Sequence, residues 1–149
     1  MWTKEDFLNY VKDTWYLKGY ASKVVSWAIG EEEQVLEDYL AKNERDQEGF
    51  PVEERYVVTD RRLLQFKLTR REIEYRTVFV SDNIASIIQR FPVPENLQLG
   101  YEWMRAPNVE VVLKDGSSIT FEAPTYPEDK EQFKKFVSAL VSLFPARRS

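Results

Sequence analysis

Carboxylates are the main candidates for acid–base chemistry in this sequence. The chain contains no cysteine and no histidine, which excludes disulfides, thiolate nucleophiles, cysteine metal sites and mechanisms that need an imidazole. Two facing carboxylates could serve as general acid and base, but nothing in the sequence brings a pair together in a cleft. We therefore expect no enzymatic activity and no cofactor. The candidate carboxylates are Asp60, Asp82, Glu102 and Glu110.

Two acidic runs could bind a hard cation such as calcium. They are Glu31–Glu33 and the spaced set Glu44, Asp46 and Glu48. Neither run has the Asp-x-Asp-x-Asp-Gly spacing of a calcium-binding loop. The sequence therefore predicts solvated acidic segments and no metal site.

Basic residues collect in the middle of the chain, after an acidic first third. Residues 1–54 hold 6 Lys and Arg against 13 Asp and Glu, and residues 55–90 hold 8 against 4. Arginine matches phosphate in bidentate geometry, so the middle segment could contact anionic lipid, phosphate or an acidic protein partner. A solvated face, or docking onto the chain's own acidic third, is favoured over lipid or phosphate contact. The net charge of −4 argues against nucleic-acid binding. The candidate contacts are Lys67, Arg70, Arg71 and Arg76.

Aromatic residues offer two further sites. Trp2, Trp15 and Trp27 lie in the amphipathic N-terminal region and could dock on a protein partner. The acidic polar faces of the first expected helix disfavour anionic membranes. A second aromatic set, at strand spacing, is expected to form core, with a small-ligand pocket as the alternative. This set is Tyr75, Phe79, Phe91, Tyr101 and Trp103.

Three helices, and a fourth segment that could be helix or strand, are expected to help position these residues. Thr3 caps a first helix that runs to about Lys18, where Gly19 stops it. Residues 22–30 fit a helix slightly better than a strand. A helix is expected over residues 31–42, since acidic residues favour a helix N-terminus, followed by a polar connection over 43–53. A final amphipathic helix opens at Pro127.

Seven strands are expected from residue 54 onward, where the apolar period changes to two. Connections are short, so neighbours should pair antiparallel. Asp115-Gly116 is a strong hairpin signal. The expected strands are Arg55–Thr59, Arg62–Leu68, Glu72–Val80, Asn83–Phe91, Asn96–Arg105, Asn108–Lys114 and Ser117–Ala123.

The segment Val57-Val58-Thr59-Asp60-Arg61-Arg62-Leu63-Leu64 resembles a hairpin common in bacterial pleckstrin-homology-like (PH-like) domains. Ile84-Ala85-Ser86-Ile87-Ile88 is similar to the fourth-strand pattern of those domains. The Asp115-Gly116 hairpin and the Phe-rich C-terminal helix stand where the family places its own. On the residues alone, Thr59, Asp60, Arg61 and Arg62 are interpreted as a structural turn motif.

The resemblance covers residues 53–145 and implies an α+β, PH-like fold. In that fold a seven-stranded antiparallel curved sheet or barrel is capped by a C-terminal helix; the N-terminal helices expected before it come from the residues alone, because the resemblance does not account for the N-terminal third. Residues 1–52 would be a helical extension packed on the barrel, and residues 53–149 the barrel with its helix. The implied function is non-enzymatic contact with a protein partner or self-association. Binding of anionic lipid or phosphate headgroups, and carriage of a small ligand, are the alternatives.

The expected location is the cytoplasm. The N-terminus turns acidic at once and lacks the apolar run of a signal peptide. No stretch approaches the roughly 20 apolar residues of a membrane-spanning helix.

Overall fold

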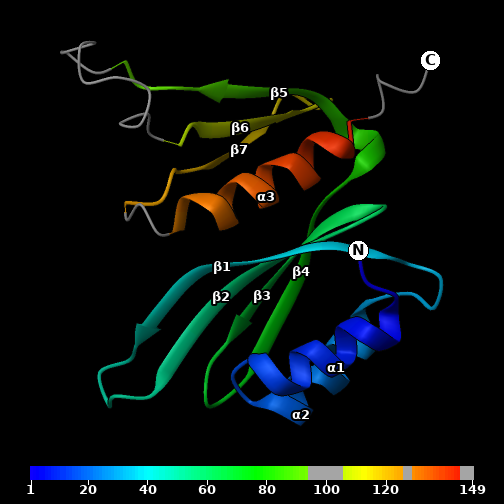
Figure 1. Ribbon diagram of the computed structural model, residues 1–149, viewed down its shortest axis with the longest axis vertical. Helices are drawn as coiled ribbons and strands as arrows, with labels where there is room; N and C mark the ends of the chain where they lie inside the picture. The colour runs from blue at the N-terminus through cyan, green and yellow to red at the C-terminus, as the bar shows by residue number, and fades with distance from the viewer. Residues whose placement is uncertain (94–105, 126–128, 145–149) are drawn as a thin grey trace. The chain divides into compact units, whose positions relative to one another are not determined.

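The computed structural model describes residues 1–93, 106–125 and 129–144, and divides the chain into two compact units at Val80 and Ser81. The first unit contains two helices and a four-stranded antiparallel sheet of order β1-β2-β3-β4 (Figure 1). Its elements are α1 (Lys4–Thr14), α2 (Lys18–Ala28), β1 (Val35–Arg45), β2 (Pro51–Thr59), β3 (Arg62–Leu68) and β4 (Ile73–Val80).

The second unit contains a three-stranded antiparallel sheet of order β5-β6-β7 and one helix. Asp115-Gly116 forms the predicted β6–β7 turn, in which Gly116 has a φ of +92° and the Ser117 carbonyl accepts from Leu113 N–H at 2.8 Å. Phe121 of β7 meets Phe136 of α3 edge to face, with ring centroids 5.3 Å apart. The elements are η1 (Ser81–Asn83), β5 (Ile84–Arg90), β6 (Asn108–Leu113), β7 (Ser118–Phe121) and α3 (Lys130–Ser142).

The α+β class, the N-terminal helices and the C-terminal helix are confirmed, but the single seven-stranded sheet or barrel is wrong. The described strands fall into two separate sheets, because β4 pairs only with β3 and β5 only with β6. The unit boundary also differs from the expected division at residues 52 and 53, since β1 pairs with β2 along its length. The strand expected over 96–105 lies outside the described residues.

Residues 35–45 form strand β1, so the helix expected over 31–42 is wrong. Local propensity favoured a helix, but pairing with β2 overrides it. Of the expected polar connection over 43–53, only residues 46–50 form the β1–β2 turn. Asp46 closes this turn, because its Oδ1 accepts from Phe50 N–H at 2.9 Å. Gly49 takes the left-handed conformation there, with a φ of +86°.

Helix α2 extends from Lys18 to Ala28 and passes through Gly19. The expectation that Gly19 ends the first helix is therefore wrong, and α1 ends earlier, at Thr14. The open question over residues 22–30 is thereby settled as helix through Ala28. A sharp reversal separates it from α1, with φ of 68° at Leu17 and 44° at Lys18. The Thr3 cap of α1 is confirmed, because Thr3 Oγ1 accepts from Asp6 N–H at 3.2 Å.

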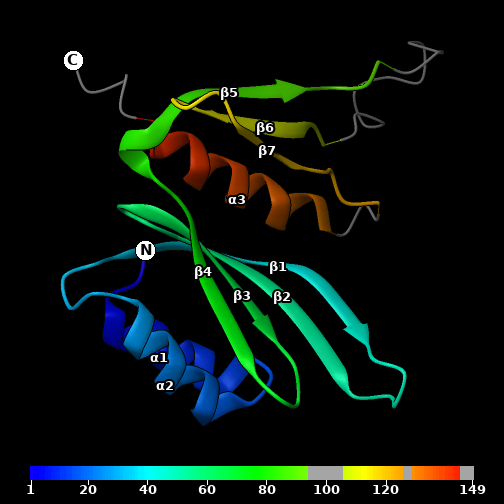
Figure 2. The same ribbon diagram turned by 180° about the vertical axis from the view of Figure 1, so that it is seen from behind.

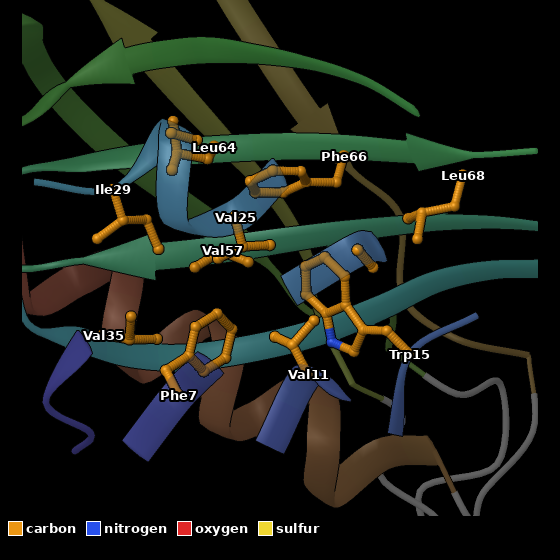
Figure 3. Packing of buried hydrophobic residues seen from close by; sticks show 12 residues of the cluster. Phe7, Val11, Trp15, Val25, Ile29, Val35, Val57, Leu64, Phe66 and Leu68 are labelled. Carbon is orange, nitrogen blue, oxygen red and sulfur yellow. The ribbon is translucent and has the colours of Figure 1, made fainter. Parts of the chain in front are cut away.

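Both N-terminal helices cover the same face of the β1–β4 sheet (Figure 2). Apolar side chains from helices and strands meet there in one fully buried cluster (Figure 3). Trp15 is central, with its ring centroid 6.0 Å from Phe7 and 5.3 Å from Phe66. The cluster therefore fixes both helices on the sheet. Its larger members are Phe7, Val11, Trp15, Val25, Ile29, Val35, Val57, Leu64, Phe66 and Leu68.

Candidate functional site

The basic residues of the β3–β4 hairpin are bound by an acidic hairpin of the same unit. Arg70 Nη2 lies 2.6 Å from Glu48 Oε2, and its Nε lies 3.9 Å from Asp46 Oδ2. The guanidinium also stacks over the Phe50 ring at 4.2 Å. Arg71 lies 3.9 Å from Glu48. The acidic β1–β2 turn thus neutralises the loop that was a candidate for phosphate contact.

The other two basic candidates do not join this group. Arg76 donates from Nε to Gln65 Oε1 at 2.6 Å. Lys67 is exposed and stands opposite Glu54 of β2 and Glu74 of β4 in the sheet register. The structure therefore brings Arg70 and Arg71 together but leaves no convergent cluster of four cations.

Thr59, Asp60, Arg61 and Arg62 form the tight β2–β3 turn that the sequence predicts. Thr59 Oγ1 accepts from the N–H groups of Arg61 and Arg62, at 3.2 and 3.1 Å. Asp60 pairs with Gln34, the residue before β1, through its N–H at 2.9 Å and its Oδ1 at 3.2 Å. The turn is thereby tied to the α2–β1 connection.

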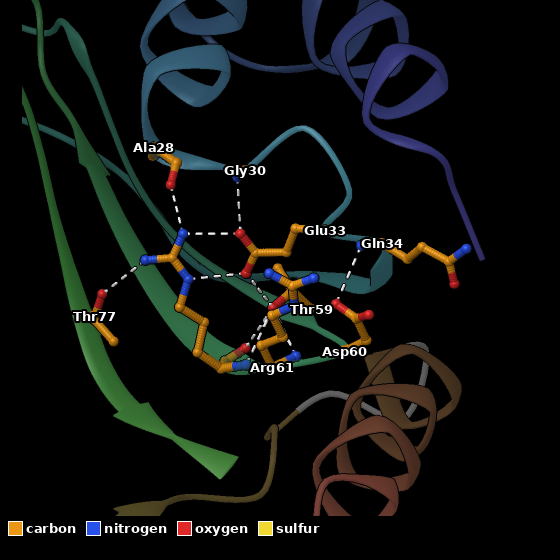
Figure 4. A network of polar contacts seen from close by, with 9 residues as sticks. Ala28, Gly30, Glu33, Gln34, Thr59, Asp60, Arg61 and Thr77 are labelled. Carbon is orange, nitrogen blue, oxygen red and sulfur yellow. Dashed lines mark hydrogen bonds and ion pairs between the residues drawn. The ribbon is translucent and has the colours of Figure 1, made fainter. Parts of the chain in front are cut away.

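Arg62 also binds Glu33 and the end of α2, which sequence reasoning missed (Figure 4). Its Nε and Nη2 donate to the two carboxylate oxygens of Glu33, each at 2.9 Å. Nη2 also donates to the Ala28 carbonyl at 2.6 Å, and Nη1 donates to Thr77 Oγ1 of β4 at 3.2 Å. One guanidinium therefore joins the C-terminal end of α2 to the edge strand β4.

Glu33 is only 3% exposed, and every bond around it favours the carboxylate. Burial alone would raise its pKa, but hydrogen bonds from Arg62, Thr59 and the Gly30 N–H outweigh burial and lower the pKa to about 2. Thr59 donates to Glu33 Oε2 at 2.6 Å. No sequence signal pairs Glu33 with Arg62, since 29 residues separate them.

A second buried ion pair lies under α1. Asp38 Oδ2 accepts from Trp15 Nε1 at 3.2 Å and from Arg55 Nη1 at 3.0 Å. Arg55 also stacks over the Trp15 ring at 5.1 Å and binds Glu53 at 3.0 Å. Burial raises the pKa of Asp38 to about 6, against the lowering effects of Arg55 and of hydrogen bonds from Trp15 and Tyr10. This network holds α1 on the sheet, and its Arg55–Asp38 ion pair is buried.

The three N-terminal tryptophans have separate environments. Trp15 is buried, and Trp2 is half-buried and stacks on Tyr10 with centroids 5.1 Å apart. Trp27 is 84% exposed, and Tyr20, two turns earlier on α2, is 63% exposed. Only Trp27 of the three is therefore placed to meet a partner.

We call the exposed side of α2 the α2 aromatic face; it consists of Tyr20, Lys23, Val24 and Trp27. The spacing places these residues on one side of the helix, beside the buried Ala21, Val25 and Ala28, and Val24 at the border packs partly against the core. The helix contains Lys18 and Lys23 but no acidic residue. Its surface is therefore aromatic and positively charged.

The second unit contains a groove of about 580 Å³ along α3. Apolar side chains dominate part of its lining, including Phe91, Phe133, Val137 and Val141. It lies within the second unit and not inside a barrel, where the small-ligand alternative would place it. Tyr101 and Trp103 of the second aromatic set lie outside the described residues.

Within the described ranges, no group of three or more acidic side chains is arranged to hold a metal ion. No helix in the same ranges is both long and apolar enough to cross a membrane. Comparison with family models, with curated proteins and with solved structures finds no match to this chain.

Proposed function

We propose that this chain is a non-enzymatic interaction module, related to PH-like domains, that binds a protein partner through the α2 aromatic face. The exposure of Trp27 carries the proposal. Tryptophan is among the side chains most enriched at the energetic centres of protein interfaces. At 84% exposure, Trp27 leaves a large apolar side chain in water unless a partner covers it.

The support of α2 favours recognition by a rigid surface. Val25 and Ala28 anchor one side of the helix in the core. Arg62 Nη2 donates to the carbonyl of Ala28, the residue after Trp27, at 2.6 Å. A preordered surface loses less conformational entropy on binding than a flexible one. This arrangement suits a docking site that does not change shape.

The charge of α2 defines the partner. Lys18 and Lys23 are exposed, and the helix contributes no carboxylate. A complementary surface offers an apolar pocket for Trp27 and an acidic group for Lys23, the lysine of the α2 aromatic face. Anionic lipid is disfavoured as the ligand of the basic loop, because Asp46 and Glu48 already bind Arg70.

The PH-like relationship rests on the order of elements and on short motifs. Four antiparallel strands, then three antiparallel strands, then a Phe-rich helix follow one another along the chain. The Thr59–Arg62 turn joins the second and third of these strands. Fold likeness alone selects no ligand, so the binding proposal depends on the α2 aromatic face.

Affinity capture with variants tests the proposal. Proteins retained by the wild-type chain are compared with those retained by Trp27→Ala and by Lys12→Ala, an exposed control on α1. A partner is then purified and its affinity measured. We expect Trp27→Ala to weaken binding by about 2 kcal/mol, roughly thirtyfold, and Lys12→Ala to leave it unchanged. Equal binding by both variants contradicts the proposal.

A further inference from the structure

The two edge strands of the four-stranded sheet, β1 and β4, differ in how far their outer backbone groups are protected from pairing with another strand. At the β1 edge, Trp2 exchanges two backbone hydrogen bonds with Val35, at 2.8 and 3.0 Å. The pairing of β1 with β2 is interrupted twice, and β1 ends in the exposed residues 42–45, which include Lys42, Glu44 and Arg45. Bulges, charges and short capping segments are the usual means by which a protein blocks pairing at an edge. The β1 edge is therefore protected.

Within the described residues, the β4 edge has neither a register shift nor a capping segment over its first five residues, and its charged side chains there are Glu74 and Arg76. Ile73 to Thr77 pair with Leu68 to Leu64 of β3 in unbroken register. Within the described part of the chain, no residue hydrogen-bonds to the outer side of β4. The strand has no proline and no lysine, and its only register shift lies beyond Thr77.

The backbone groups that face outward can be identified from the hairpin. Thr69 N–H donates to the Glu72 carbonyl at 3.0 Å, so these two residues form a hydrogen-bonded pair. Bonded and non-bonded pairs alternate along an antiparallel ladder. The N–H and C=O groups of Ile73, Tyr75 and Thr77 therefore point away from β3, and no described strand lies beside them.

The side chains of these residues lie on the helix-covered face and are held in place. Ile73 packs against the core cluster. Tyr75 stacks on Phe66 with centroids 5.6 Å apart and remains 37% exposed. Thr77 Oγ1 accepts from Arg62. The edge is thus a rigid row of backbone groups that no described residue pairs with.

The α2 aromatic face lies on the same side of the unit as this edge. Ser22 Oγ donates to the Leu8 carbonyl, which identifies the flank of α2 that meets α1. At about 100° per residue, Tyr20, Val24 and Trp27 fall roughly opposite Ser22. Helix α2 contacts β4, and Arg62 joins its end to Thr77. The aromatic face is therefore on the flank away from α1 and toward β4.

We propose that an extended segment of a partner protein adds to the outer edge of β4 and places its side chains against the α2 aromatic face. This inference rests on the proposed function and specifies its ligand. Unpaired N–H and C=O groups at strand spacing are matched by an extended polypeptide backbone. Such a strand would lie about 4.8 Å beyond β4. Alternate apolar residues would meet Trp27 and Tyr20, and an acidic residue would meet Lys23.

A library of linear peptides, selected against the full chain, provides the probe. We expect enriched peptides to alternate apolar residues and to include an acidic one. Bound peptide should slow hydrogen exchange at the amides of Ile73, Tyr75 and Thr77 in the wild-type chain by about tenfold or more. Failure to enrich any peptide, or unchanged exchange at these three amides, overturns the inference.

A proline substitution separates backbone from side-chain effects. Tyr75→Pro removes an N–H that points outward, a position where a strand tolerates proline, and Tyr75→Ala controls for the lost ring. We expect Tyr75→Pro to bind selected peptides several-fold more weakly than Tyr75→Ala, the cost of a lost hydrogen bond. Equal binding by the two variants contradicts strand addition. The exchange measurement needs no variant, so a poorly folded Tyr75→Pro does not block the test.

Two outcomes distinguish this inference from the function on which it rests. If Trp27→Ala abolishes partner binding and Tyr75→Pro does not differ from Tyr75→Ala, the α2 aromatic face stands and strand addition fails. If neither residue matters, both proposals fail. If the chain forms a concentration-dependent dimer that Tyr75→Pro abolishes, the β4 edge pairs with a second copy of the chain. That outcome overturns the proposal that a segment of a different protein binds there.

Discussion

Arg62 binds both carboxylate oxygens of Glu33 at 2.9 Å, although 29 residues separate the two in the chain. Glu33 is 3% exposed, while the Arg62 side chain is 23% exposed. The same guanidinium holds the Ala28 carbonyl and the Thr77 hydroxyl. A single side chain therefore links the connection before β1, the end of α2 and the edge strand β4, which are the elements that present the proposed binding surface.

Replacing Arg62 tests this link through stability. Arg62→Ala leaves the Glu33 carboxylate buried without its cation, so we expect the free energy of unfolding to fall by about 3 kcal/mol. Arg61→Ala, at the exposed neighbouring position, should change it by less than about 0.5 kcal/mol. Urea unfolding of the two variants gives the comparison. Equal losses would show that the Arg62 contacts do not contribute as described.

Glu33 makes stability depend on acid pH. Its pKa is lowered from 4.5 to about 2 in the folded chain, so the unfolded chain binds the proton more readily. Ionised Glu33 therefore contributes fully to the free energy of unfolding above pH 4.5. This contribution, about 3 kcal/mol, is lost as the pH falls through about 2. The difference in unfolding free energy between wild type and Glu33→Gln should shrink over this interval. A difference independent of pH would contradict the assignment.

Asp38 makes stability depend on pH in the opposite direction to Glu33. Burial raises its pKa from 3.8 to about 6, so the folded chain binds the proton more readily than the unfolded chain. Protonated Asp38 therefore contributes fully to the free energy of unfolding below pH 3.8, and this contribution is lost as the pH rises through about 6. Unfolding free energies of Asp38→Asn, compared with wild type across this interval, should lack that decline. Glu44→Gln, at an exposed position of the same strand, serves as the control and should keep it.

The acidic β1–β2 hairpin controls access to the basic loop. With Asp46 and Glu48 bound to Arg70, we expect the wild-type chain to sediment equally with neutral and anionic vesicles at low salt, where screening is weakest. The double variant Asp46→Asn/Glu48→Gln frees Arg70 and Arg71 and should bind anionic vesicles more strongly. Anionic binding by the wild type that is lost in Arg70→Ala would instead support the lipid alternative.

Elements with local signals were predicted from the sequence. Thr3 marks the start of α1, Asp115-Gly116 the β6–β7 turn, and Thr59 to Arg62 the β2–β3 turn, because each depends on bonds within a few residues. Strand β1 was missed, because only its pairing with β2 makes it a strand. The division into two sheets was also missed, since strand order follows from long-range pairing.

The candidate site was predicted in part. The sequence placed Trp2, Trp15 and Trp27 together as partner contacts, but only the helical register of α2 and the core around Trp15 separate the exposed ring from the others. The match between acidic and basic segments was anticipated as an alternative and takes the form of Arg70 with Glu48. Glu33 was expected to be solvated, because nothing near it in the chain indicates Arg62.

The most direct test of the α2 aromatic face is photo-crosslinking in the cell that produces the protein. A photoreactive phenylalanine analogue replaces Trp27 in one variant and Asn9, exposed on α1, in another. Our account predicts a discrete crosslinked protein at position 27, absent at position 9 and diminished when Tyr20→Ala is added. No crosslink at position 27, or the same products at both positions, would contradict the claim that this face binds a protein partner.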